Sequence, residues 1–325
     1  MDRLVSGFEA RPLWPGGPSV GPIGLGTAEL GMVYGTPGTP ATRPSARAAA
    51  KFVGAALDRG VRFFDTARGY GVAEARLGRA IGGRDGVIVA TKASVPPGMA
   101  GRSVELSLER SLRASLRALR IETVDVFQLH SVGVEMIGRE DVMAALDRLK
   151  ERGWIRMAGA TVYEAEAARA AITSGAYGVL QIAVHPLDPA LEGVLQDASA
   201  SGIGVVARSV LLRGSLTPRA ASLPVRLAPL RDAAYALAAA AETDLAGLPS
   251  VAYRWALGRP AVAVALVGTC DLGELDAAIA AAAAGPLAPA IVREIASLPP
   301  VAGSSADPRT WDAPVASTVN VGDLQ

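Results

Sequence analysis

Cysteine, histidine and lysine are all scarce in this chain of 325 residues. A single cysteine, Cys270, excludes an internal disulfide and a cysteine-rich metal site. The only two histidines, His130 and His185, leave little from which a metal centre could be built, so we expect no bound metal. Only three of the 32 basic residues are lysines. A lysine where chemistry needs a compact point charge therefore stands out.

The chain also lacks an excess of charge and a long apolar run. Its net charge is +1, without the basic surplus typical of proteins that bind nucleic acids or anionic membranes. Residues 1–14 are charged early and have no continuous apolar stretch, unlike a secretory signal. The most apolar C-terminal segment, Leu275–Val292, carries Asp276, Pro286 and Pro289, which favours a surface-packed helix and its exit over a membrane span. We therefore expect a soluble, cytoplasmic protein with no nucleic-acid or membrane partner.

Half of the residues are hydrophobic, which is ample for a large core. Eight short runs rich in β-branched residues recur along the chain, and several are continuously apolar, as in parallel strands covered on both faces. They are Pro22–Thr27, Val61–Asp65, Val87–Lys92, Val124–His130, Ile155–Thr161, Val179–Val184, Gly204–Ser209 and Ala263–Gly268.

Amphipathic patterns with helical spacing separate these runs. They are Ser45–Arg59, Arg102–Arg120, Asp141–Arg152, Glu164–Ser174, Pro189–Ser201 and Leu272–Ala283. Strand and helix repeated eight times predict an α/β fold, a (β/α)8 TIM barrel, as one domain spanning residues 1–325. An open sheet of the dinucleotide-binding type is the weaker prediction, because Ile23–Thr27 lacks the third glycine of the motif that marks such sheets.

Three segments interrupt the alternation. Residues 1–20 are predicted to contain a hairpin, Arg3–Val20, that closes the bottom of the barrel. Ser222–Glu242 adds a second helix before the last strand. Residues 300–325, rich in Pro, Ser and Asp, are predicted to form a loop tail anchored by Trp311.

Chemically capable side chains stand where consecutive predicted strands end: Asp65 and then Tyr70, Lys92, and His130. The C-terminal ends of barrel strands carry the active site in this fold. A neighbouring ammonium lowers the pKa of a phenol, a carboxylate holds the ammonium in place, and an imidazole can donate a hydrogen bond to a carbonyl oxygen. Alone, each has a structural explanation: a helix cap, packing, a surface lysine or a core histidine. Together they predict a proton-donating site.

The motifs around these residues resemble the aldo-keto reductase superfamily. The run Phe64–Gly71, continued by Glu74 and Leu77-Gly78, is similar to that family's signature. Thr91-Lys92 and Gln128–His130 match its next two catalytic stretches.

The likeness extends from Ile23 to Ile279, and Gly26–Met32 with Arg208–Val210 looks most like a bacterial branch of the family. It implies a barrel that binds NADPH without a separate nucleotide-binding domain.

By resemblance, Tyr70 is the general acid that protonates the carbonyl oxygen as hydride arrives. Lys92 tunes Tyr70, Asp65 supports Lys92, and His130 orients the carbonyl. A histidine at this position, where a branch that reduces C=C bonds has glutamate, favours carbonyl chemistry.

The resemblance also implies where the cofactor lies. The nicotinamide end would meet Gly26, Thr27, Thr161, Gln181 and Arg208, the pyrophosphate Ser209, Leu211 and Arg213, and the adenosine end Gly268, Thr269 and Glu274.

Three of these positions depart from the family pattern. Val162 replaces an asparagine that grips the carboxamide, and Arg208 replaces an aromatic ring beside the nicotinamide. Asp271 and Glu274 stand where basic residues often hold the 2′-phosphate. NADP(H) is the family default, but these carboxylates leave NAD(H) open unless Arg219 or Arg226 reaches in.

We expect an NAD(P)H-dependent enzyme that reduces an aldehyde or ketone, such as a sugar or biosynthetic intermediate, or runs in reverse. The alternative is a cofactor-binding, redox-sensing subunit with little turnover. A further variant reduces an activated C=C bond. The substrate, the direction and the oligomeric state are not encoded in any motif of the chain.

Overall fold

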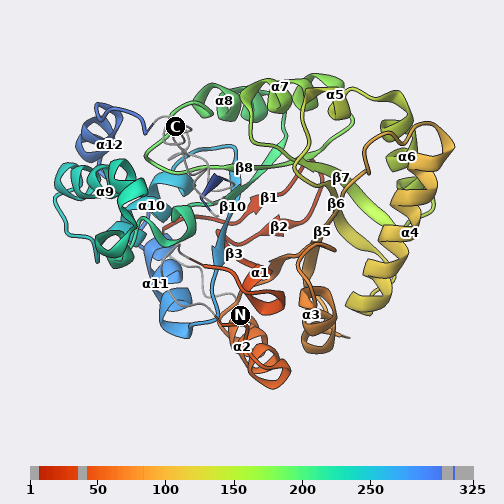
Figure 1. The fold of residues 1–325 in the computed structure, drawn as a ribbon, viewed down its shortest axis with the longest axis horizontal. Coiled ribbons are helices and arrows are strands. Elements are labelled where there is room, and N and C mark those ends of the chain that lie inside the picture. The colour runs from red at the N-terminus through yellow and green to blue at the C-terminus, as the bar shows by residue number, and fades with distance from the viewer. Residues whose placement is uncertain (1–6, 36–41, 83, 302–309, 312–325) are drawn as a thin grey trace, which may run out of the picture.

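Eight parallel strands form a closed barrel, with helices around it, in the computed structural model of residues 7–35, 42–82, 84–301 and 310–311 (Figure 1). The strands are β3 (Ile23–Gly26), β4 (Phe63–Asp65), β5 (Ile88–Ala93), β6 (Val124–Leu129), β7 (Ile155–Thr161), β8 (Val179–Ala183), β9 (Gly204–Arg208) and β10 (Val262–Gly268). β10 pairs with β3 and closes the barrel. The predicted barrel is confirmed, each strand ending within two residues of its expected limits.

Successive residues on each strand point alternately into the barrel and toward the helices. On β4, Phe63 belongs to the apolar cluster inside the barrel and Phe64 to the cluster between strands and helices. Asp65 follows on the inward face. On β5, Ile88 lies inside and Lys92, four residues later, points the same way. The interior is thus apolar in its lower layers and polar at the C-terminal ends of the strands.

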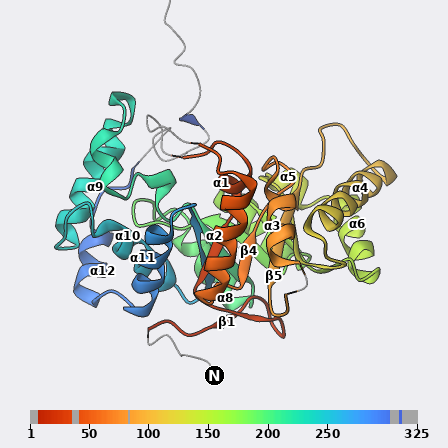
Figure 2. The ribbon, with the colours of Figure 1, turned by 90° about the horizontal axis from the view of Figure 1, so that it is seen from below.

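A short hairpin closes the opposite end of the barrel. β1 (Arg11–Pro12) pairs antiparallel with β2 (Ser19–Val20), and Figure 2 shows β1 at the end of the barrel where the chain begins. Leu13, Trp14 and Val20 join the inner apolar cluster. The predicted hairpin is confirmed from residue 11 to residue 20, whereas residues 1–6 lie outside the described part.

Helices and short 3-10 turns cover the outside of the barrel. They are α1 (Ala28–Gly31), α2 (Ala46–Asp58), α3 (Ala73–Ile81), α4 (Arg102–Leu119), α5 (Val134–Ile137), α6 (Glu140–Glu151), α7 (Ala165–Ser174), α8 (Glu192–Ala200), η1 (Leu212–Gly214), η2 (Pro218–Ser222), η3 (Val225–Leu227), α9 (Ala228–Ala240), α10 (Leu248–Leu257), α11 (Leu272–Ala283) and α12 (Pro289–Ala296). The six predicted helices are present, and α9 is the extra helix before the last strand. In the described ranges, no helix has the length and apolarity needed to cross a bilayer.

One expectation about the C-terminal region is wrong. Pro289 does not mark an exit into loop but begins α12, where its missing N–H would have no helical partner anyway. Of the predicted tail, only residues 300–301 and 310–311 are described. Trp311 is 2% exposed, consistent with its expected role as an anchor.

Leu13→Ala tests whether the hairpin packs tightly against the end of the barrel. Leu13 is fully buried, so we expect the substitution to lower the free energy of unfolding by about 2–5 kcal/mol in urea denaturation. Val225→Ala is the control, because Val225 is 87% exposed and its loss should change stability by less than about 0.5 kcal/mol. Equal effects of the two substitutions would contradict tight packing of the hairpin against the barrel.

Candidate active site

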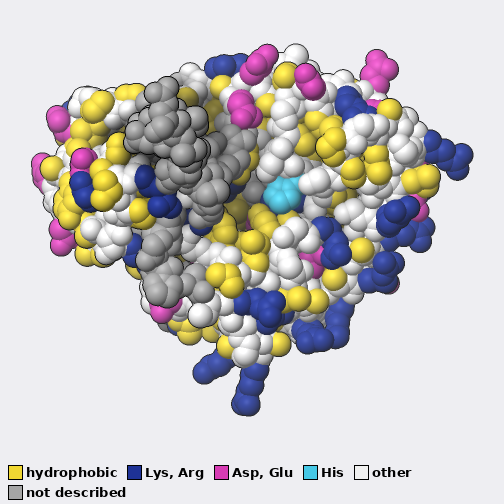
Figure 3. All heavy atoms as spheres, in the orientation of Figure 1, with side chains coloured by type: hydrophobic (Ala, Val, Ile, Leu, Met, Phe, Trp, Pro, Cys, Tyr) yellow, Lys and Arg dark blue, Asp and Glu magenta, His cyan; other side chains and the backbone are white. Residues whose placement is uncertain are grey.

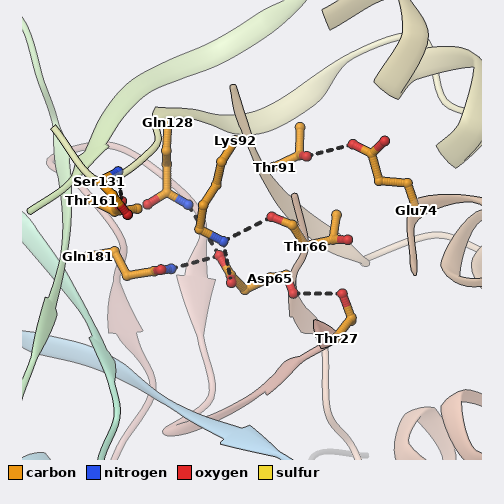
Figure 4. Close-up of polar contacts among 10 residues, drawn as sticks. All are labelled: Thr27, Asp65, Thr66, Glu74, Thr91, Lys92, Gln128, Ser131, Thr161 and Gln181. Atoms are coloured by element: carbon orange, nitrogen blue, oxygen red, sulfur yellow. Dashed lines mark hydrogen bonds and ion pairs between the residues drawn. The ribbon is translucent and has the colours of Figure 1, made fainter. Parts of the chain in front are cut away.

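A buried ion pair lies at the centre of the polar end of the barrel (Figure 4). Lys92 Nζ lies 2.5 Å from Asp65 Oδ2 and donates a second hydrogen bond to the Thr66 carbonyl at 2.9 Å. Lys92 is 1% exposed and Asp65 2%. Burial lowers the pKa of Lys92, but Asp65 and Tyr70 outweigh burial and raise that pKa overall. The buried lysine is therefore charged.

Two glutamine amides complete the surroundings of Asp65. Gln181 Nε2 donates to Asp65 Oδ1 at 2.7 Å, and Gln128 Nε2 donates to the same oxygen at 3.2 Å. Gln181 was expected to contact a cofactor, whereas the structure shows its amide bound to Asp65. Gln128 lies in the predicted stretch Gln128–His130, but no role was assigned to it. The signal for a role is its position on β6 two residues before His130, which directs both side chains to the same side.

Tyr70 lies beside this ion pair. Lys92 Nζ is 5.0 Å from the centre of the Tyr70 ring, and the rings of Tyr70 and His130 meet edge to face with centroids 5.8 Å apart. Burial raises the pKa of Tyr70, and the charge of Lys92 lowers it only in part. The expected lowering by Lys92 is present, but the deep burial of the phenol outweighs it, so the pKa is raised overall. Tyr70 is a protonated phenol at neutral pH.

Two glycines let α1 approach the loop that carries Tyr70. A Cβ on Gly31 would lie 1.8 Å from the Tyr70 carbonyl oxygen, and a Cβ on Gly71 would lie 2.6 Å from the Gly31 carbonyl oxygen. Gly71 also has a φ of +58°, which glycine adopts without strain. Gly71 of the signature and Gly31 of α1 therefore fix where Tyr70 stands.

His130 follows β6 and is half-buried at the mouth of the barrel. Burial, and then the charge of Lys92, lower the pKa of His130 to about 4. The imidazole is neutral at pH 7 and can donate one hydrogen bond. Histidine is visible near the middle of the face in Figure 3, with hydrophobic side chains beside it.

The expected nicotinamide contacts lie at the ends of β3, β7 and β9. Thr27 Oγ1 donates to the Asp65 carbonyl at 3.0 Å, and Thr161 Oγ1 accepts from the Ser131 N–H at 2.6 Å. Gly26 ends β3 beside them. The Arg208 guanidinium lies over the Tyr163 ring, 3.9 Å from its centroid, and donates to the Val162 carbonyl at 3.1 Å. Stacking on Tyr163 was not expected.

The loop after β9 turns sharply over the barrel mouth. Ser209 and Arg213 have φ values of +56° and +51°, and Leu211 precedes the turn. Arg213 Nε donates to the Gly35 carbonyl at 3.0 Å, and its guanidinium lies 5.0 Å from the centroid of the Tyr34 ring. Arg213 therefore joins this loop to the loop after β3.

An ion pair occupies the turn after β10. Glu274 accepts from Arg219 Nη2 at 2.6 Å and from Thr269 Oγ1 at 2.5 Å, one turn after Gly268. The pKa of nearby Glu29 is raised to about 7, mainly by burial and then by the charge of Glu274, while Arg219 acts in the opposite direction. Of the two arginines considered, Arg219 reaches this turn.

Three other residues considered in the sequence lie outside this cluster. Arg226 binds the Trp311 carbonyl at 2.8 Å. His185 is 4% exposed and has a pKa lowered to about 4 by burial. Burial raises the pKa of the Cys270 thiol to about 12, as befits an unreactive filler. Among the residues that the structure describes, no three His, Cys, Asp or Glu side chains are grouped to hold a metal ion.

Comparison with known proteins identifies the family. The sequence model of the aldo/keto reductase family matches residues 22–299. A 6-dehydroglucose reductase from Novosphingobium aromaticivorans is 29% identical over 80% of this chain and 85% of its own. Aldo-keto reductase yakc [NADP(+)] from Schizosaccharomyces pombe is 28% identical over 62% of this chain and 61% of its own. A solved aldo-keto reductase from Bacillus halodurans has a TM-score of 0.73 at 21% identity, covering 91% and 97% of the two chains.

The chain belongs to the aldo/keto reductase family, and it is an oxidoreductase. The resemblance drawn from the signature is thereby confirmed. The family acts on small-molecule carbonyl compounds and generally uses NADP(H).

Both imidazoles should remain neutral well below pH 6.5 in NMR titration, with midpoints near pH 4, because burial lowers both pKa values. The unfolded chain binds protons near pH 6.5, so the free energy of unfolding should decrease as pH falls from about 6.5 to about 4. His130→Gln would leave one imidazole and assign the signals. A midpoint near 6.5 for either would contradict the burial described.

Proposed function

We propose that this enzyme reduces an aldehyde or ketone to an alcohol with a nicotinamide nucleotide, and catalyses the reverse oxidation. The observation that carries this proposal is the cluster of Tyr70, Lys92, Asp65 and His130 at one end of a closed barrel. A buried phenol beside a buried ammonium suits proton transfer to and from a carbonyl oxygen.

In this proposal Tyr70 donates its phenolic proton to the carbonyl oxygen during reduction. The charge of Lys92 stabilises the phenolate left behind, and Asp65 keeps that charge in place. His130, neutral at pH 7, donates a hydrogen bond to the same oxygen and so orients the carbonyl. The nicotinamide, when bound, supplies or accepts the hydride.

The residues along one arc of the mouth fit a dinucleotide. Thr161 ends β7, Arg208 ends β9 and Arg213 lies in the loop after it, while Thr269 follows β10, so hydroxyl and guanidinium groups lie at the ends of these three strands. The turn after β10 also opens α11, where the Asp271 side chain caps the Glu274 N–H and the remaining first-turn N–H groups favour an anion. The loops after the last two strands are common phosphate sites in such barrels.

Arg219 reaches the adenosine end, as NADP(H) would require, but Glu274 pairs with its charge there, so NAD(H) stays open beside the family's usual NADP(H). The charge of Arg76 also acts on Cys270 within this turn. Glu29 adds a second carboxyl nearby, half-ionised at pH 7. A 2′-phosphate would meet two carboxyl groups, whereas a carboxylate accepts hydrogen bonds from a ribose diol. We propose that Glu274 binds the ribose hydroxyls.

We also propose a sugar-derived carbonyl compound as substrate. Tyr34 is exposed beside Met32 at the barrel mouth, where an aromatic ring can pack on the apolar face of a sugar. The relative named 6-dehydroglucose reductase acts on such a compound by its name. A regulatory subunit with little turnover is less favoured, because cofactor binding alone does not need a buried lysine beside a phenol.

Tyr70→Phe removes the transferable proton but little volume. We expect kcat to fall by about 10²–10⁴-fold, while nucleotide affinity changes little. Turnover of a panel of sugar aldehydes and fluorescence titration with nucleotide would measure the two quantities. Tyr235→Phe, at a half-exposed position on α9, is the matched control and should behave as the unaltered enzyme. Retained turnover in Tyr70→Phe would contradict the proposed role.

Glu274→Gln tests the cofactor preference. The change removes a carboxylate and releases Arg219, so we expect kcat/KM for NADPH relative to NADH to rise about tenfold, equivalent to roughly 1.4 kcal/mol. Asp276→Asn is the control: it lies on the same helix, pairs with Arg59, and should leave the ratio unchanged. An unaltered ratio in Glu274→Gln would mean that Glu274 does not face the ribose.

A further inference from the structure

Glu74 is a buried carboxylate that the proposed proton transfer does not use. It lies in the first turn of α3 and is 2% exposed. Its Oε1 accepts from Thr91 Oγ1 at 2.7 Å and its Oε2 accepts from Arg68 Nη1 at 2.6 Å (Figure 4 shows the first contact). Burying a charge is unfavourable unless it is paired in this way.

The two partners of Glu74 adjoin the two residues whose spacing matters most at the site. Thr91 precedes Lys92 on β5, so its side chain points out of the barrel while that of Lys92 points in. Arg68 stands two residues before Tyr70 on the loop after β4. Glu74 therefore ties the strand that carries Lys92 to the loop that carries Tyr70.

Backbone contacts also join this loop to β5, since the Thr66 N–H donates to the Ala90 carbonyl at 2.8 Å. The Arg68 N–H donates to the Lys92 carbonyl at 3.3 Å, a long bond for a backbone amide. The Tyr70 N–H donates to the Ala67 carbonyl at 3.0 Å, a contact within the loop itself. Glu74 accepts two short side-chain hydrogen bonds. The one from Arg68 comes from a charged donor, and the one from Thr91 is fully buried.

We propose that Glu74 is a positioning residue for catalysis: by bridging Thr91 and Arg68 it sets the distance between the Lys92 ammonium and the Tyr70 phenol. This inference rests on the proposed function. Glu74 reaches neither side chain itself and acts through their backbone segments. A displacement of about 1 Å between reacting groups can lower a rate by as much as 10²-fold.

The chemistry of the bridge explains why a carboxylate stands here. Both partners donate hydrogen bonds, so both Glu74 oxygens must accept. A glutamine would turn its NH2 group, a donor, toward either Thr91 or Arg68, and one of the two hydrogen bonds of the bridge would be lost. Valine at position 91 keeps the shape of threonine but removes the hydroxyl, whereas serine keeps the hydroxyl.

The decisive comparison is Thr91→Val against Thr91→Ser, with Glu74→Gln as the second break in the bridge. We expect kcat to fall roughly 10- to 100-fold in Thr91→Val and Glu74→Gln, with KM and nucleotide Kd within about twofold. Thr91→Ser should keep most of the activity. The alkaline limb of kcat for reduction should move to higher pH in the broken variants, because Lys92 then lowers the pKa of Tyr70 less.

Glu109→Gln is the matched control, since Glu109 also bridges two arginines, Arg113 and Arg152, but on the outer helices. It should leave kcat and its pH profile unchanged. Thermal unfolding separates folding from positioning: a lower melting temperature in Thr91→Val with unchanged kcat and pH profile would overturn the inference. If Glu74→Gln fails to fold, the Thr91 pair decides alone. No turnover by the unaltered enzyme would refute the proposed function, and this inference with it.

Discussion

The buried ion pair between Lys92 and Asp65 is the constraint on which the polar end of the barrel depends. Removing either charge from water costs several kcal/mol, and only close geometry with further hydrogen bonds offsets that cost. The Thr66 carbonyl satisfies Lys92, while Gln128 and Gln181 satisfy Asp65. Loss of one partner would leave the other charge buried and unpaired. The inward-facing polar side chains of neighbouring strands therefore form one hydrogen-bond network around this ion pair.

The fold was predictable from the sequence because its signals are local. Each strand is a short apolar run covered on both faces, and each helix has its own amphipathic spacing. The catalytic cluster was predictable for a related reason. Asp65, Lys92 and His130 end or follow consecutive strands, and parallel strands bring their C-terminal ends to one rim. Topology alone therefore determines that these side chains meet.

What the sequence did not reveal depends on depth and on distant contacts. Lys92 lowers the pKa of Tyr70 as expected, but burial outweighs that effect, and no pattern in the sequence reports how deeply a loop residue is buried. Arg219 and Glu274 are 55 residues apart, and Arg213 and Gly35 are 178 apart. The turn at Ser209 and Arg213 uses positive φ angles without glycine, so no residue type announces it. The side-chain contacts at these positions were accordingly harder to predict than the cluster of Asp65, Lys92 and His130.

Burial has one effect on the Tyr70 phenol and another on the field of the Lys92 ammonium, and both effects matter at this site. Burial keeps Tyr70 protonated at neutral pH, as the proposed proton donation requires. The same low-polarity surroundings strengthen the field of Lys92, which in the proposed reaction would stabilise the phenolate as the proton leaves. An exposed pair would have a phenol of ordinary pKa and a screened ammonium. The height of these side chains, one layer above the apolar interior and just below the rim, is thus what suits them to proton transfer in either direction.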